Sequence, residues 1–97
     1  MAEVLTIDTL RRRIDVIDDQ LVRLLNVRVA CAVEIGQLKH QAGLPIYQPD
    51  REKQVLEQVR KAATDLSGPL NAEAVVRIFE RIIDEARRCE REAQRRE

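Results

Sequence analysis

A long helical pattern without a breaking residue constrains this chain more than any other feature. Neither proline nor glycine occurs between Leu10 and Ile35. Over the same region, apolar or small residues recur at steps of three, four or seven, at Leu10, Ile14, Ile17, Leu21, Leu24, Cys31, Ile35 and Leu38. This spacing places them on one face of an α-helix. The sequence therefore predicts one unusually long helix.

Breaking and capping residues divide the chain into helices. Asp8 or Thr9 can cap the start of the long helix, and Gly43 followed by Pro45 ends it. Asn71 can cap a later helix, which we expect to fray into the charged tail after Glu90. The predicted fold is all-α, a single domain over residues 1–97 with three helices, one of them very long: residues 9–41, 49–66 and 71–92.

The length of the first helix predicts a second copy of the chain. A helix of thirty-odd residues spans roughly 50 Å, whereas a compact chain of this size has a radius of gyration of roughly 12–13 Å. The helix therefore extends beyond any globule that one chain can build around it. We expect its apolar face to be covered in a helical homodimer.

Composition excludes several classes of function. The 17 basic and 17 acidic side chains balance, so no net field favours nucleic acid or membrane. The longest uncharged stretch, His40 to Pro49, is far shorter than the roughly 20 residues of a membrane span. Cys31 and Cys89 have no metal-ligand spacing, so we expect no metal site. No secretory pattern precedes Asp8, which indicates a cytoplasmic protein.

Two cations interrupt the apolar pattern of the first helix. Arg28 occupies the position between Leu24 and Cys31 where an apolar residue is expected. Lys39 follows three turns later, within about 20° of Arg28 and roughly 16 Å along the axis. Together they can contact one small anion. The alternative is a buried Arg28–Glu pair, or a side chain that reaches solvent at the edge of the dimer.

Further charges stand where helices begin or where a buried face continues. Glu90 follows the apolar stripe of the third helix, although it can also be a solvated residue near the helix end. Arg51 and Glu52 lie in the first turn of the second helix, where a plain surface is the alternative. As a set, these residues and the two cations indicate a pocket for a small polyanion between helices.

The chain also resembles the all-helical chorismate mutases, in the order and spacing of three segments from Leu10 to Glu90. These segments are Leu10-Arg11-x-x-Ile14-Asp15-x-Ile17-Asp18-x-x-Leu21-x-x-Leu24-Leu25-x-x-Arg28, then Ile35-Gly36-x-x-Lys39 with Gly43-Leu44-Pro45-Ile46-Tyr47-x-Pro49-x-Arg51-Glu52, and Ile78-Phe79-x-x-Ile82-Ile83. The resemblance implies an intertwined homodimer that converts chorismate to prephenate for phenylalanine and tyrosine synthesis. This isomerase reaction needs no cofactor or metal.

The resemblance assigns roles to individual residues. Arg28 and the partner's Arg11 would bind the two carboxylates of chorismate. Arg11 is too far from Arg28 to share a ligand within one chain, at roughly 25 Å along the helix. Lys39 would donate to the ether oxygen, and Glu52 would accept from the ring hydroxyl. Arg51 would support that corner of the site.

Three positions depart from the commonest family pattern: Gln48, Ala86 and Glu90. Gln48 replaces an acidic residue and Ala86 a hydroxyl residue, and each change weakens substrate binding by about 1 kcal/mol. Glu90 stands where glutamine is common. Since a carboxyl group donates a hydrogen bond only when protonated, we expect an enzyme that prefers mildly acidic conditions. Alternatively, Glu90 pairs with Lys39 or faces water.

Other functions remain open at this point. An isochorismate-pyruvate lyase has the same fold and a cationic pocket, and a non-catalytic dimerisation module would also need the apolar face. The resemblance leaves open a partner enzyme of aromatic biosynthesis. A nucleic-acid binder is disfavoured because Arg87–Arg88 and Arg95–Arg96 alternate with glutamates, as on a solvated helix end.

Overall fold

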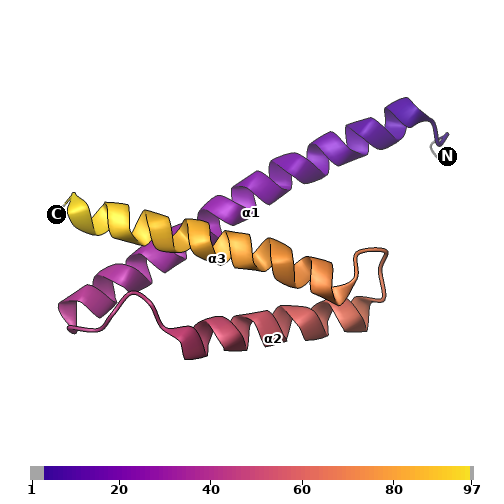
Figure 1. Cartoon of the computed structure of the whole chain (residues 1–97). Helices are drawn as coiled ribbons and strands as arrows, with labels where there is room; N and C mark the ends of the chain where they lie inside the picture. The colour runs from indigo at the N-terminus through magenta and orange to yellow at the C-terminus, as the bar shows by residue number, and fades with distance from the viewer. Residues whose placement is uncertain (1–3, 97) are drawn as a thin grey trace.

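The computed structural model describes residues 4–96, and within this range it is all-α, as predicted (Figure 1). Its three helices are α1 (Ile7–Gln41), α2 (Pro49–Leu66) and α3 (Ala72–Arg95). The described residues contain no β-strand. The long uninterrupted pattern at the start of the chain thus forms one continuous helix of 35 residues.

The start of α1 differs from the prediction. The N-cap is Thr6, not Asp8 or Thr9. The Thr6 hydroxyl accepts from the Thr9 backbone N–H at 3.1 Å, and the Thr9 hydroxyl accepts from the Thr6 N–H at 2.9 Å. This reciprocal pair satisfies two backbone donors that a helix start would leave unpaired. Asp8 instead lies in the first turn, where its charge suits the helix dipole.

The other helix ends follow familiar chemistry. Gly43 adopts a left-handed backbone (φ 71°) in the turn after α1, and Pro49 occupies the first turn of α2. Asn71 caps α3, since its side-chain oxygen accepts from the Ala74 N–H at 2.8 Å. The expected fraying after Glu90 is wrong, because α3 continues to Arg95.

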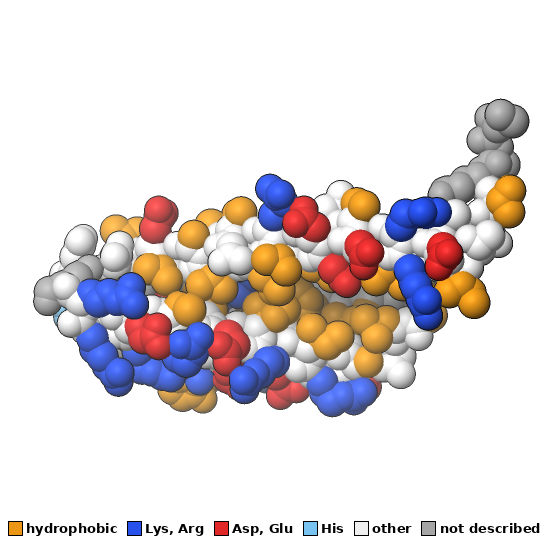
Figure 2. All heavy atoms as spheres, turned by 90° about the horizontal axis from the view of Figure 1, so that it is seen from above, with side chains coloured by type: hydrophobic (Ala, Val, Ile, Leu, Met, Phe, Trp, Pro, Cys, Tyr) orange, Lys and Arg blue, Asp and Glu red, His pale blue; other side chains and the backbone are white. Residues whose placement is uncertain are grey.

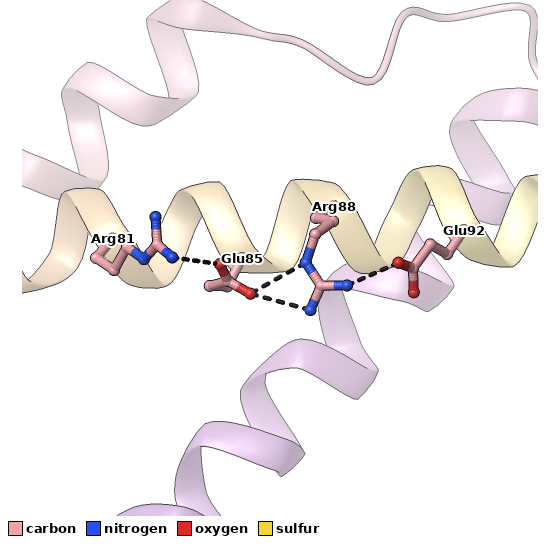
Figure 3. Close-up of polar contacts among 4 residues, drawn as sticks. All are labelled: Arg81, Glu85, Arg88 and Glu92. Carbon is pink, nitrogen blue, oxygen red and sulfur yellow. Dashed lines mark hydrogen bonds and ion pairs between the residues drawn. The ribbon is translucent and has the colours of Figure 1, made fainter.

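An exposed row of alternating charges accompanies the last turns of α3 (Figure 3). Arg81 pairs with Glu85 at 3.0 Å, and Arg88 pairs with both Glu85 at 3.0 Å and Glu92 at 2.7 Å. These partners are three or four residues apart, so they lie on one face of the helix. The hydrogen bonds and charge of Glu85, followed by those of Glu92, raise the pKa of Arg88. The row supports the continuation of α3.

Helix α3 packs against both other helices, whereas α1 and α2 do not pack against each other within residues 4–96. The amino-terminal half of α1 extends away from α2 and α3 (Figure 1). The molecule measures 57 × 29 × 19 Å and its radius of gyration is 17.2 Å, above the roughly 12–13 Å of a compact chain of this size. A single chain is therefore elongated.

The apolar face of α1 is open in the single chain. Side chains along it are 44% to 65% exposed, at Leu10, Ile14, Ile17, Leu21 and Leu24. Among residues 4–96, Val76 and Ala86 are the only buried hydrophobic side chains. A strip of hydrophobic side chains bordered by charged ones runs along the molecule in Figure 2. None of the described helices has the length and apolar character needed to span a membrane.

Candidate active site

A hollow of about 460 Å³ lies between the three helices and the segment that precedes α2. Helix α1 supplies its cationic wall, α2 contributes from its first turns, and α3 closes the remaining side. Seven of the eight predicted site residues line it: Arg28, Lys39, Gln48, Arg51, Glu52, Ala86 and Glu90.

The eighth predicted residue, Arg11, does not line the hollow. It is exposed on the part of α1 that extends away from the other helices. Seventeen residues of continuous helix separate it from Arg28, roughly 25 Å along the axis. Arg11 of the same chain therefore cannot take part in this site.

The two cations of α1 are held by different contacts. The guanidinium of Arg28 lies 5.9 Å from the centroid of the Phe79 ring on α3, within range of a cation–π interaction. Within residues 4–96 Arg28 forms no ion pair, so the alternative of a buried Arg28–Glu pair is not seen. The ammonium of Lys39 donates to the backbone carbonyl of Ile46 at 3.3 Å. Lys39 thereby ties the segment before α2 to α1.

Glu90 is the buried acid of the site. It is 9% exposed, and its Oε2 atom has no hydrogen-bond partner in the described part of the chain. Burial raises the pKa of the Glu90 carboxyl, while the positive charges of Lys39, Arg87 and Arg91 act in the opposite direction. The alternative of a solvated residue at a frayed helix end is therefore wrong.

The corner formed by the start of α2 contains an ion pair between Glu52 and Arg87 of α3. The guanidinium of Arg87 also lies 5.0 Å from the centroid of the Tyr47 ring. Arg51 lines the hollow but is exposed, and its guanidinium donates to Gln54 on the same helix. Glu52 is thus joined to α3, whereas the contact of Arg51 stays within α2.

Arg87 is a site residue that the sequence pattern does not single out. The alternating charges around Arg87 and Arg88 predict that both lie on a solvated surface. This is right for Arg88 but wrong for Arg87, whose side chain is only 24% exposed. A signal for it exists in the sequence. Ile83, Arg87, Glu90 and Gln94 follow one another at steps of four, three and four, the spacing of one helix face.

The lining of the hollow suits a small polyanion. Arg28, Lys39, Arg51 and Arg87 provide four cations against the carboxyl groups of Glu52 and Glu90. Guanidinium groups bind carboxylates through two parallel hydrogen bonds, which fixes orientation as well as affinity. The described residues contain no group of three or more His, Cys, Asp or Glu side chains arranged to hold a metal ion.

Comparison with known families identifies the family and its fold. The family model described as "Chorismate mutase type II" matches residues 10–91. The chain belongs to the chorismate mutase type II family. Chorismate mutase from Helicobacter pylori, solved in complex with prephenate, is similar with a TM-score of 0.80 and 27% identity, over 91% of this chain and 92% of that chain. Form II of the chorismate mutase from Thermus thermophilus is similar with a TM-score of 0.75 and 31% identity, over 82% of this chain and 88% of that chain.

Curated relatives include chorismate mutases of different lengths. The bifunctional chorismate mutase/prephenate dehydratase of Aquifex aeolicus is 40% identical over 75 residues, which are 76% of this chain and 21% of that protein. The chorismate mutase of Methanocaldococcus jannaschii is 29% identical over 77% of this chain and 74% of its own length. The chain therefore spans about a fifth of the length of the bifunctional relative. The family resemblance, to a family of isomerases, is confirmed.

Proposed function

We propose that this chain is a chorismate mutase that rearranges chorismate to prephenate in the synthesis of phenylalanine and tyrosine. One observation carries the proposal. Arg28 and Lys39 of α1, Glu52 of α2 and Glu90 of α3 line a single hollow, although each interrupts or flanks an apolar helix face. This set matches the chemistry of a dianion that also has an ether oxygen and a hydroxyl group.

The reaction is an intramolecular rearrangement, in which a C–O bond breaks while a C–C bond forms. No nucleophile or proton transfer is required. Catalysis comes from holding the substrate in its compact, reactive shape and from stabilising the charge that develops on the ether oxygen. The proposed roles follow from this need. Arg28 binds one carboxylate, Lys39 donates to the ether oxygen and a carboxylate, and Glu52 accepts from the ring hydroxyl.

The remaining lining residues shape the site around these groups. Gln48 contributes a neutral, half-buried side chain beside the substrate. Ala86 is 4% exposed and provides apolar wall where a hydroxyl would offer a further hydrogen bond. Arg51 supports the corner that contains Glu52. Glu90, in its protonated form, donates a second hydrogen bond to the ether oxygen.

An intertwined homodimer completes the site in this proposal. The open apolar face of α1 supports it, because a second copy of α1 would cover that face. Arg11 supports it as well, since this cation lies outside its own site and a partner in antiparallel orientation would bring the partner's Arg11 to the second carboxylate. Each dimer then has two equivalent sites, as the symmetry of a twofold interface requires.

Mixing two inactive variants tests the shared site. Arg11→Ala and Arg28→Ala are unfolded together and refolded, so that half of the dimers contain one chain of each kind. Each mixed dimer has one site with both arginines and one with neither. About a quarter of wild-type turnover should return. Failure of the mixture to regain activity would contradict the shared site.

The activity itself is tested by incubating the purified chain with chorismate and identifying the product, at about pH 5.5 and about pH 7.5. Formation of prephenate supports the proposal, and a faster rate at the lower pH supports protonated Glu90. Equal rates would remove Glu90 from the chemistry. Absence of turnover would overturn the proposal, and pyruvate release from isochorismate in a parallel assay would favour the lyase on the same fold.

A partner enzyme of aromatic biosynthesis is the remaining part of the proposal. It is supported by relatives whose name joins chorismate mutase to prephenate dehydratase in one chain. Transfer of product to such an enzyme would appear as a shorter lag in a coupled assay when both proteins are present.

A further inference from the structure

We propose that Arg87 is a positioning residue, which holds the Glu52 carboxylate inside the active-site hollow and neutralises its charge in front of a dianionic substrate. This inference rests on the proposed function, because it assigns Glu52 to the substrate. It adds a residue that neither the sequence pattern nor the family resemblance pointed to.

Arg87 joins three parts of the chain at the corner of the site. From α3 it forms an ion pair with Glu52 of α2, and both side chains are about three-quarters buried, at 24% and 25% exposure. Its guanidinium also lies against Tyr47, in the segment between α1 and α2. A guanidinium flanked by an aromatic ring and a carboxylate has little freedom to move. The orientation of Glu52 therefore depends on Arg87.

Glu52 stands between two hollows, so its direction is not fixed by its own helix alone. It lines the active-site hollow and also a second hollow of about 470 Å³ on the outer side of α2 and α3. The outer hollow contains the cations Lys53 and Arg60, of which Arg60 pairs with Glu73, and three further acids, Glu57, Glu80 and Asp84. Arg87 lines the inner hollow and is absent from the residues that line the outer one. Its ion pair thus favours the inner direction.

The charge of Glu52 is the second reason for a partner. An unpaired carboxylate in a half-buried site repels a dianion, because the effective dielectric constant there is well below that of water. The ion pair with Arg87 offsets this charge, and it is closer than the 3.7 Å contact of Arg87 with Asp84 on its own helix. The contact is made through Oε1 of Glu52, so Oε2 can accept the hydrogen bond from the substrate hydroxyl. Arg87 therefore acts on the substrate through Glu52.

The test is a cycle of variants at these two positions, measured by steady-state chorismate turnover. Arg87→Met keeps the alkyl packing and removes the charge. It should raise KM about tenfold with less than about a threefold change in kcat, since substrate binding loses more than the chemical step. Arg87→Lys restores the charge without the planar fork and should give an intermediate KM. In a Glu52→Gln background, Arg87→Met should raise KM less than about twofold.

Arg88→Ala is the matched control, because Arg88 is the next residue on α3 but is exposed and paired with Glu85 and Glu92. It should change neither KM nor kcat. An equal rise of KM with and without Glu52 would overturn the inference, since Arg87 would then bind substrate directly or merely support the fold. An unchanged KM in Arg87→Met would overturn it while the proposed function stands. A wild-type chain without turnover would remove both.

Discussion

The Oε2 atom of Glu90 lies 3.0 Å from the position that a Cβ atom would take on Gly36. Helix α3 therefore approaches α1 as closely as a glycine allows, and it does so at the buried acid of the site. The amide of Gln94 strengthens the approach, since its Nε2 donates to the Gly36 carbonyl at 3.3 Å. The place of the Glu90 carboxyl is thus set by a missing side chain on the opposite helix.

Gly36→Ala should reduce activity without unfolding the protein. A methyl group at this position would lie 3.0 Å from Oε2 and 3.1 Å from Cγ of Glu90, so the carboxyl group must shift by a few tenths of an ångström. Such a displacement should lower kcat about tenfold. The free energy of unfolding should change by less than about 1 kcal/mol. The higher helix propensity of alanine is worth roughly that amount, and it offsets the cost of the close contact with Glu90. Steady-state kinetics and urea unfolding measure the two effects.

Gly68→Ala is the control for this substitution, because a Cβ at Gly68 meets no atom within 4 Å. It should leave kcat unchanged. If both alanine variants retained full activity, the position of Glu90 would not matter for the reaction.

Activity should fall as pH rises. Burial raises the pKa of Glu90 above its ordinary value of about 4.5, against the opposing charges of Lys39, Arg87 and Arg91, and the carboxyl donates only while protonated. Above that pKa, kcat/KM should decrease by up to about tenfold per pH unit. Glu90→Gln donates at every pH and should give a flat profile. A wild-type profile that stays level between about pH 5 and pH 8 would be inconsistent with protonated Glu90.

The free energy of unfolding should also depend on pH through the protonation of the Glu90 carboxyl. Because the pKa of Glu90 is higher in the folded chain than in the unfolded one, the folded state binds more protons between the two values. The contribution of Glu90 is therefore fully present below about pH 4.5 and is lost as pH rises through the folded pKa. Glu90→Gln should gain stability relative to wild type as pH rises above about 4.5, the ordinary pKa of the carboxyl group. Urea unfolding of both proteins at each pH measures the difference in their free energies of unfolding. If Glu90 is fully solvated, this difference should not vary with pH.

Arg28→Ala should abolish most turnover while preserving the helices. The side chain is half-buried and touches Phe79 rather than an acid, so its removal should cost less than about 1 kcal/mol of stability. In catalysis it should lower kcat/KM at least about a hundredfold. Arg23→Ala, an exposed arginine of the same helix that pairs with Asp19, is the control. Wild-type turnover by Arg28→Ala would contradict the proposed role of Arg28 in binding a substrate carboxylate.

Leu21→Glu should prevent assembly. Leu21 is 51% exposed in the single chain and lies in the middle of the face that the proposed dimer covers. A charge there has no partner when the second copy packs against it. Sedimentation equilibrium should show single or unfolded chains, and turnover should disappear. Leu66→Glu, at a position that is 81% exposed at the end of α2, should behave as the wild-type chain does.

The sequence predicts the helices well because their signals are local. Apolar spacing defines α1, and Asn71 caps α3 through a contact three residues away. The predicted start of α1 is wrong because Asp8 is also a good capping residue. Thr6 is the N-cap because it forms reciprocal hydrogen bonds with Thr9, and these depend on the geometry of both hydroxyl groups.

The site is predictable where a charge interrupts an apolar face, as Arg28 and Glu90 do. Arg87 shares the helical spacing of Ile83 and Glu90, but the sequence around it has the alternating charges of a solvated surface. Its partner Glu52 is 35 residues away. The spacing places Arg87 on the face of Glu90, but it does not show that α2 meets α3 there, which the packing of the two helices reveals.

The small interior of the single chain has a consequence for how the proposed dimer comes into being. With Val76 and Ala86 as the buried hydrophobic side chains of residues 4–96, one copy removes too little apolar surface from water to offset the entropy of ordering its backbone. Folding and association then become one bimolecular reaction, and the melting temperature should rise with protein concentration. On dilution, folded pairs would give way directly to unfolded chains, without a folded single chain between them.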